Sequence, residues 1–231
     1  MQGLFRNPLA DPGLIGISSG AVFATACTIV LGWSFHSVLG YYGLSFFAFV
    51  GALLSAFLVV NLSSVGKATT VSLMLLVGLA LNALFGAGTS FLIYLAKDDE
   101  LRSITFWTLG SLGGANWTVI LTLCPLLVVP AILLYLMSDE YDAFSLGESE
   151  AYFLGVDVQK LKRRAIIYVT LSVSASIALV GMIGFIGLIV PHITRTLVGV
   201  GHKKVFTVSI LIGGILLVIA DTLARTIVMP A

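Results

Sequence analysis

Long apolar segments separated by short polar ones dominate the chain. Asp, Glu, Lys and Arg are all absent from five segments: residues 12–66, 68–96, 103–138, 165–194 and 205–220. A helix needs roughly 20 apolar residues to cross a hydrocarbon core of about 30 Å, because each residue adds about 1.5 Å. The apolar runs are continuous, without the alternation of a β-barrel strand. The pattern therefore predicts an all-α fold, a polytopic transmembrane helix bundle.

The apolar runs predict where the membrane spans lie. We expect full spans at Leu14–Trp33, Leu44–Leu62, Val71–Ala96, Trp117–Met137, Ala165–Ile183 and Val205–Val228. Pro125 and Pro130 lie inside the fourth of these spans and should kink or shorten it. Leu101–Gly114 is too short and too rich in glycine to cross, which indicates a helix lying at the interface. A short polar turn is expected at Ser63–Thr69.

One apolar segment, residues 184–201, is interrupted. Gly184, Gly187 and Pro191 mark a structural break, after which Leu188–Val200 gives about 20 Å of helix, too short to cross. We expect a broken half-span, either a packing kink, the commoner case, or a re-entrant element beside a transport path. His192 fits a satisfied interior histidine better than a metal ligand, because no second ligand stands at metal spacing.

Composition supports the membrane assignment. Of the 231 residues, 58% are hydrophobic and 10% are charged, against about 25% charged in an average soluble domain. This excludes an ordinary cytosolic enzyme, a nucleic-acid-binding protein and a disordered protein. Cys27 and Cys124 lie inside apolar runs and are interpreted as small core residues. The sequence has no cleavable signal peptide, and both of its ends look truncated.

The distribution of Lys and Arg predicts the orientation. One side of the predicted bundle carries eight basic residues: Arg6, Lys67, Lys160, Lys162, Arg163, Arg164, Lys203 and Lys204. The other side carries Lys97, Arg102 and Arg225. The first side is therefore expected to be cytoplasmic, provided that the broken segment returns the chain to that side.

The longest polar stretch, residues 138–164, is expected to be a cytoplasmic loop holding a short helix. Ser145 and Glu148 have the spacing of a capping box, Gly155 fits a left-handed C-cap, and Asp157 can cap the next helix. Residue physics alone slightly favours a loop that only connects two spans. The alternative is a docking helix for a cytoplasmic partner.

Two further sets of polar residues are candidates for function. Ser72, Asn82, Gly86 and Ser90 lie near one face of the third span, where they could form interhelical hydrogen bonds or line a translocation path. Arg225 follows Asp221 by four residues near the outer end of the last span. That pair either supports its own helix or offers Arg225 to an acidic partner outside.

The sequence lacks the motifs of common catalytic sites. It contains no G-x-x-x-x-G-K-[ST], no H-E-x-x-H and no G-x-S-x-G. We therefore expect no catalytic residue, no metal site and no nucleotide site in this chain.

Four strings, in this order, resemble one family along the whole chain. They are Arg6–Ala21 (RNPLADPGLIGISSGA), Leu146–Gly155 (LGESEAYFLG), Gly184–Arg195 (GFIGLIVPHITR) and Ala220–Arg225 (ADTLAR). The family is the FecCD/BtuC-type permeases of bacterial ABC importers, which move iron–siderophores, haem or cobalamin across the inner membrane. The resemblance implies a ten-helix subunit, so this chain would lack the first two helices and the final one. It would then be a single permease domain, residues 1–231, truncated at both ends, with residues 138–164 as its coupling loop.

The resemblance also implies partners and site residues. The chain would bind no cofactor itself, since ATP and Mg²⁺ belong to cytoplasmic ABC ATPase subunits. A periplasmic or lipid-anchored binding protein would dock at Arg225, and a second permease subunit would form a homodimer or pseudo-dimer in the lipid membrane. The ATPase-coupling residues would be Leu146, Gly147, Glu148, Ser149, Ala151, Leu154 and Gly155. The residues of the path and its gate would be Thr70, Val71, Ser72, Asn82, Gly86 and Ser90.

An iron chelate, siderophore or haem, is the expected cargo, with cobalamin as the alternative. Two other classes of function are weaker expectations. An ion-coupled secondary transporter would need a buried acid at mid-membrane, and only Asp221 and Arg195 come near the apolar interior. An intramembrane enzyme would need a paired nucleophile and base, which the sequence does not offer.

Overall fold

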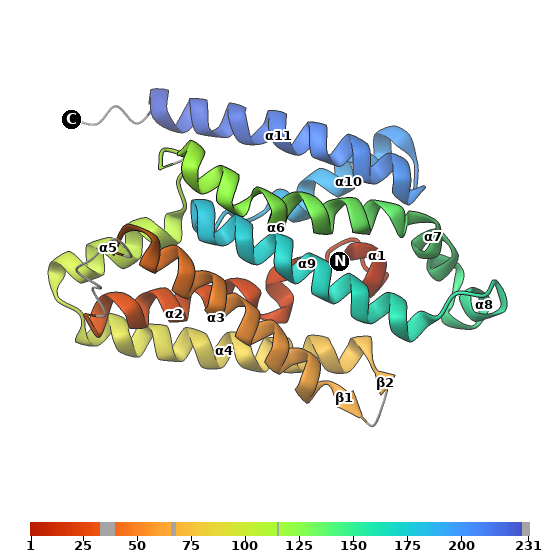
Figure 1. Cartoon of the computed structure of the whole chain (residues 1–231), viewed down its shortest axis with the longest axis horizontal. Coiled ribbons are helices and arrows are strands. Elements are labelled where there is room, and N and C mark those ends of the chain that lie inside the picture. Colours follow the sequence, from red (N-terminus) through yellow and green to blue (C-terminus); the bar gives the residue numbers. More distant parts are fainter. Residues whose placement is uncertain (33–39, 66–67, 115, 228–231) are drawn as a thin grey trace.

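The computed structural model describes residues 1–32, 40–65, 68–114 and 116–227, which form a bundle of helices (Figure 1). The helices are α1 (Gln2–Phe5), the 3-10 helix η1 (Pro12–Ile15), α2 (Ile17–Val30), α3 (Gly40–Leu62), α4 (Val71–Leu95), α5 (Asp98–Leu109), α6 (Trp117–Leu136), α7 (Ser138–Leu146), α8 (Glu148–Phe153), α9 (Val158–Val180), α10 (Ile186–Val198) and α11 (His202–Ile227). Between α3 and α4, β1 (Ser64–Val65) pairs antiparallel with β2 (Ala68–Thr69). The predicted all-α class is confirmed, and the expected polar turn at 63–69 contains this small hairpin.

Among the described residues, five helices are long and apolar enough to cross a membrane: α3 from Gly43, α4, α6, α9 and α11. They match the second to the sixth predicted spans, because uninterrupted apolar runs favour helices of that length. The two prolines do not shorten α6, which runs unbroken from Trp117 to Leu136. The ends of the first and last predicted spans, Trp33 and Val228, lie outside the described residues, as does Lys67.

The prediction of one continuous first span was wrong. The segment folds as η1 and the 14-residue α2, separated by Gly16 in a left-handed conformation with φ 76°. The break exposes backbone carbonyls that need partners at membrane depth. The Ser55 hydroxyl of α3 donates to the Gly16 carbonyl at 2.6 Å, and the Asn82 side chain of α4 donates to the Gly13 carbonyl at 3.0 Å.

The predicted half-span is confirmed, but its break lies earlier than expected. The chain is irregular from Gly181 to Phe185, and the 13-residue α10 then runs through Gly187 and Pro191. Both were predicted to break the helix, but α10 continues through them and holds Pro191 inside it. The interpretation of His192 as an interior histidine was wrong, because its side chain is exposed on α10.

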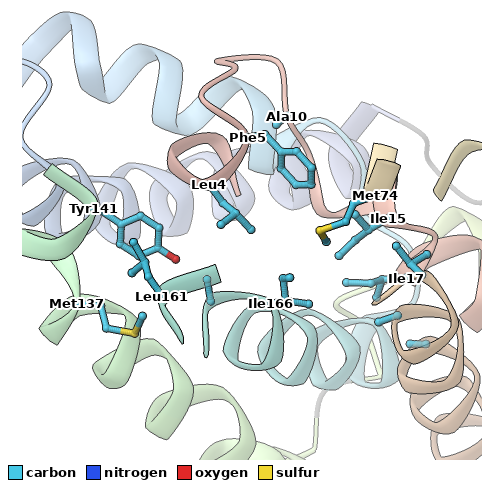
Figure 2. Packing of buried hydrophobic residues seen from close by; sticks show 14 of the residues in the cluster. Leu4, Phe5, Ala10, Ile15, Ile17, Met74, Met137, Tyr141, Leu161 and Ile166 are labelled. Carbon is cyan, nitrogen blue, oxygen red and sulfur yellow. The ribbon is translucent and has the colours of Figure 1, made fainter. Parts of the chain in front are cut away.

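α9 is the central helix of the bundle. It packs against α6 on one side and α3 on another, while α2 packs against α3 and α4, and α10 against α11. Figure 2 shows the largest buried cluster, in which Leu161 and Ile166 of α9 lie between residues of the N-terminal segment, such as Leu4 and Ile15, and Tyr141 of α7. α9 thus joins the N-terminal half to the C-terminal half.

The bundle has two ends, seen at the right and left of Figure 1. The right end, here called the α8 end, holds α7, α8, the β1–β2 hairpin and the first residues of α9 and α11. The left end, the α5 end, holds α5 and the last turns of α11. α10 returns the chain to the α8 end, where the His202 N–H donates to Asp142 Oδ1 of α7 at 3.0 Å. The condition on which the predicted orientation depended is therefore met.

Candidate functional site

The polar stretch at the α8 end forms two helices joined by one residue, Gly147. Gly147 has φ 151° and ψ 154°, and a Cβ on it would stand 1.6 Å from a carboxylate oxygen of Glu150. The Glu150 carboxylate could move aside, but residues with a side chain rarely adopt this positive φ, so the turn favours glycine. The predicted capping box was wrong: α7 continues past Ser145, whose hydroxyl donates to the Asp142 carbonyl at 2.7 Å.

The far side of α8 follows the sequence prediction. Gly155 adopts φ 84° directly after the helix, as a left-handed cap requires. Asp157 then caps α9, since its side chain accepts the Lys160 N–H at 3.1 Å. The two caps turn α8 sharply away from α9, so that α8 projects from the end of the bundle (Figure 1).

A salt bridge fixes α8 to α9. Lys162 Nζ lies 2.8 Å from Glu148 Oε1, and the Lys162 side chain is only 4% exposed while that of Glu148 is 50% exposed. Lys162 also lies over the ring of Phe144, 5.9 Å from its centroid, and the Arg6 guanidinium lies 4.4 Å from the same centroid. The buried Ala151 completes the contact with the core. Sequence reasoning missed this salt bridge, because Lys162 is one of four basic residues in a short run.

The outer face of α8 exposes large apolar side chains. Tyr152 is 73% exposed, Phe153 85% and Leu154 63%, and Leu146 at the end of α7 is 68% exposed. Ser149 is exposed beside them. These residues lie beyond the end of the membrane-length helix α9. An exposed apolar patch of this kind marks an interaction surface.

Two ion pairs connect α7 to α11. His202 Nδ1 lies 2.6 Å from Asp142 Oδ1, and Lys203 Nζ lies 2.8 Å from Asp139 Oδ2. Partial burial alone would raise the pKa of Asp142, but hydrogen bonds from the His202 backbone and ring, with the charges of His202 and Lys203, lower it. A movement of the α7–α8 segment would therefore be felt by both α9 and α11.

The candidate path residues of α4 divide into two groups. Asn82 bonds inside the subunit, to the Gly13 carbonyl and to the Ser19 hydroxyl at 2.5 Å, so the interhelical alternative holds for it. Ser72, Gly86 and Ser90 are exposed, and a Cβ on Gly86 would meet nothing within 4 Å. Thr70, the residue before α4, is exposed. Val71, the first residue of α4, is half-buried.

Arg225 lies at the α5 end. Its Nε donates to Asp221 Oδ2 at 2.7 Å, so the predicted pair forms. Both residues stay partly exposed, and the guanidinium reaches towards Gly113, where an added Cβ would stand 3.3 Å from it.

The described residues contain no group of three His, Cys, Asp or Glu side chains that could hold a metal ion. Cys27 and Cys124 are free thiols. The interpretation of both as small core residues is supported for Cys27, which is half-buried and packs against the smaller core cluster, whereas Cys124 is half-buried outside that cluster.

Comparison with known proteins gives this architecture a family. The model of the FecCD transport family matches residues 1–231. The chain belongs to the FecCD transport family. It is therefore a permease of the ABC importer type and a multi-pass protein of the inner membrane.

Two curated relatives have different cargoes. Over 231 residues the chain is 42% identical to the hemin transport system permease protein HmuU of Yersinia pestis, and it spans 69% of that protein. Over 225 residues it is 39% identical to the cobalamin import system permease protein BtuC of Halobacterium salinarum, spanning 59% of it. The chain thus covers about 59–69% of the length of these relatives.

A solved structure shares the fold. It is an inward-facing conformation of a metal-chelate type ABC transporter, to which the chain is 32% identical with a TM-score of 0.90. The match covers 99% of this chain and 71% of the other. The fold of this chain is therefore that of an ABC transporter permease.

Proposed function

We propose that this chain forms the membrane path of an ABC importer and that α8 is the surface on which a cytoplasmic ATPase docks. The observation that carries the proposal is the exposure of Tyr152, Phe153 and Leu154 on a helix beyond the membrane-length part of α9. Such a patch needs a partner outside the bilayer. In this proposal ATP and Mg²⁺ are bound by the ATPase, and this chain does no covalent chemistry.

The contacts around α8 explain how force from the ATPase would reach the membrane. Glu148 fixes α8 to the buried Lys162 of α9, and α7 is tied to α11 through Asp142 and His202. ATP binding elsewhere would move α8, and α9 and α11 would follow as packed bodies. A switch between outward and inward access is then a two-state rigid-body movement driven by differential nucleotide binding.

The remaining surfaces are assigned by their position. The exposed face of α4 with Ser72, Gly86 and Ser90 would line the path together with a second permease subunit, and Thr70 and Val71 would lie at its inner gate. Arg225 at the α5 end would meet an acidic residue of a binding protein on the outer side.

An iron chelate, haem or a ferric siderophore, is the cargo that we propose. The HmuU relative carries hemin by name, and the solved neighbour is named for metal chelates. Cobalamin is the second candidate, favoured by the similarity to BtuC. Uptake of labelled haem, ferric siderophore and cobalamin by the full-length transporter separates these candidates, and preferential uptake of cobalamin would overturn the first choice.

Replacing Glu148 tests the docking role. Glu148→Lys places a second positive charge beside Lys162 and should detach α8, whereas Glu150→Lys makes the same charge change at an exposed position of the same helix. We expect Glu148→Lys to lower co-purification of the ATPase and cargo uptake at least about tenfold, because a buried charge left unpaired costs several kcal/mol. Glu150→Lys should lower co-purification of the ATPase and cargo uptake less than threefold. Leu154→Asp removes part of the apolar patch without touching the salt bridge. Unchanged association in both Glu148→Lys and Leu154→Asp would disprove a docking role for α8.

A further inference from the structure

A groove open on one side lies between the last half of α3 and the first half of α9, at the α8 end. Its volume is about 640 Å³, inside the range of roughly 300–1,000 Å³ that is typical of ligand sites. From α9 it is lined by Lys160, Arg163, Ile167 and Leu171. These residues are three or four positions apart and therefore share one face of the helix.

The lining changes from basic to apolar along the groove. α3 ends where α9 begins, so the two helices run in opposite directions beside it (Figure 1). Lys160, Arg163 and the polar Asn61 lie at the α8 end, while Leu53, Phe57 and Ile167 line the part that leads towards the middle of the bundle. The groove therefore has a cationic mouth and an apolar floor.

The basic residues of this part of α9 have different surroundings. Lys162 turns inward to Glu148, on the opposite side from the groove. Lys160 lies 2.9 Å from Asp157, with both side chains exposed, which is a weak interaction. Arg163 has no ion-pair partner within the part of the chain that the structure describes. The mouth of the groove thus keeps an unneutralised positive charge.

A buried hydroxyl marks the inner part of the groove. Thr170 is 6% exposed and lines the groove, and its Oγ1 has no hydrogen-bond partner among the described residues. A buried polar atom without a partner is costly in a low-dielectric environment. Thr170 follows Arg163 by seven residues, about 10 Å along the helix.

We propose that this groove binds one anionic phospholipid of the cytoplasmic leaflet. The phosphate lies at Lys160 and Arg163, an ester oxygen accepts from the Thr170 hydroxyl, and an acyl chain lies against Phe57 and Ile167. Positive charge between transmembrane helices on the cytoplasmic side is the arrangement that recognises anionic headgroups. A free phosphate would use only the mouth, and an apolar helix would leave both basic residues without a counter-charge.

Neighbouring arginines on α9 provide a matched test. The full-length protein, stripped of lipid in detergent, is titrated with phosphatidylglycerol or with phosphatidylcholine of the same acyl chains, and bound lipid is counted by native mass spectrometry. We expect one phosphatidylglycerol per chain to bind more tightly than phosphatidylcholine. Arg163→Gln should weaken its binding about fivefold, since a basic residue near an anionic surface contributes about 1 kcal/mol. Arg164→Gln, which removes an exposed charge that does not line the groove, should change it less than twofold.

Two further arms separate the lipid from other occupants. Ile167→Trp fills the apolar floor and should reduce binding at least about fivefold while leaving both basic residues in place. Inorganic phosphate at equal concentration should not displace the lipid. Equal effects of Arg163→Gln and Arg164→Gln, no effect of Ile167→Trp, or displacement by phosphate would each overturn the proposal. None of these measurements involves transport, so their failure would leave the proposed function standing.

Discussion

The two ends of the bundle are held together by different kinds of contact. At the α8 end, ion pairs join separate helices, as Glu148 of α8 does with Lys162 of α9. At the α5 end, the only ion pair among the described residues, Arg225 with Asp221, lies within a single helix. There the chain is held by backbone: the Ser111 N–H donates to the Val180 carbonyl at 2.8 Å.

Glycines make the close backbone contact at the α5 end possible. Gly110 and Gly181 both have positive φ, and a Cβ on Gly181 would stand 2.5 Å from the Trp107 carbonyl oxygen. Backbone packed this closely leaves no room for sliding, whereas the ion pairs of the α8 end join separate helices through long side chains, which can change rotamer as the helices move. The difference indicates that the α8 end is adapted to move and the α5 end to stay fixed.

The largest expected effect comes from a methyl group at the α5 end. Gly181→Ala should lower the free energy of unfolding by about 3 kcal/mol or more, because strained φ and steric overlap add together. Gly184→Ala is the matched control, since an added Cβ there meets nothing within 4 Å. Thermal unfolding in detergent measures both variants. Equal losses in the two would show that the close contact at Gly181 does not hold the α5 end.

A smaller effect is expected at the α8 end, and it depends on pH. The hydrogen bonds from His202 lower the pKa of Asp142 in the folded state, although partial burial opposes them. The charged Asp142 therefore adds to the free energy of unfolding above the pKa of an unfolded Asp, about 3.9. This stabilisation is lost as the pH falls through the lower pKa that Asp142 has in the folded protein. The Asp142 side chain is 45% exposed, so screening by solvent limits the contribution to about 1 kcal/mol or less.

Substitution of Asp142 isolates this contribution. Asp142→Asn should be less stable than the unchanged protein at pH 6, and the difference should be smaller at pH 3. Glu150→Gln, at an exposed position of α8, should show no such change. Apparent unfolding temperatures at both pH values give the comparison. A difference that grows at low pH would contradict the assigned sign.

The long helices could be predicted from the sequence because they depend on local composition. Continuous apolar runs gave α4 and α6 to within one residue at each end. The caps at Gly155 and Asp157 were also predictable, since a cap involves only neighbouring residues.

The broken first span could not be predicted, because its cause lies far along the chain. The carbonyls at Gly13 and Gly16 are accepted inside the bundle only because Ser55 and Asn82, from two other helices, donate to them. The pattern of apolar residues along the chain cannot predict a hydrogen bond between separate helices. The capping box predicted at Ser145 was wrong for a related reason. The spacing of Ser145 and Glu148 fits a capping box, but Phe144 packs in the core and α7 continues past Ser145.

The candidate site was predictable in position more than in contacts. Resemblance to a family located Leu146–Gly155, and the exposed side chains of α8 agree with a surface there. The sequence does not indicate which basic residue turns inward, because Lys160, Lys162 and Arg163 are distinguished only by the residues of other helices that they contact. Glu148 and Phe144 select Lys162.

The smallest effect on stability, and the sharpest test of the fixed end, concerns Arg225. An exposed ion pair four residues apart in a helix contributes about 0.3–0.5 kcal/mol to stability. The free energies of unfolding of Arg225→Gln and Asp221→Asn should therefore each lie within about 0.5 kcal/mol of that of the unchanged protein. Their effects on a binding protein should differ. Arg225→Gln removes the charge offered to an acidic partner and should slow association and reduce its salt dependence. Asp221→Asn leaves Arg225 charged and releases it, so association should stay equal or become faster. If both substitutions slow association equally, the pair supports its own helix and Arg225 is not the docking residue.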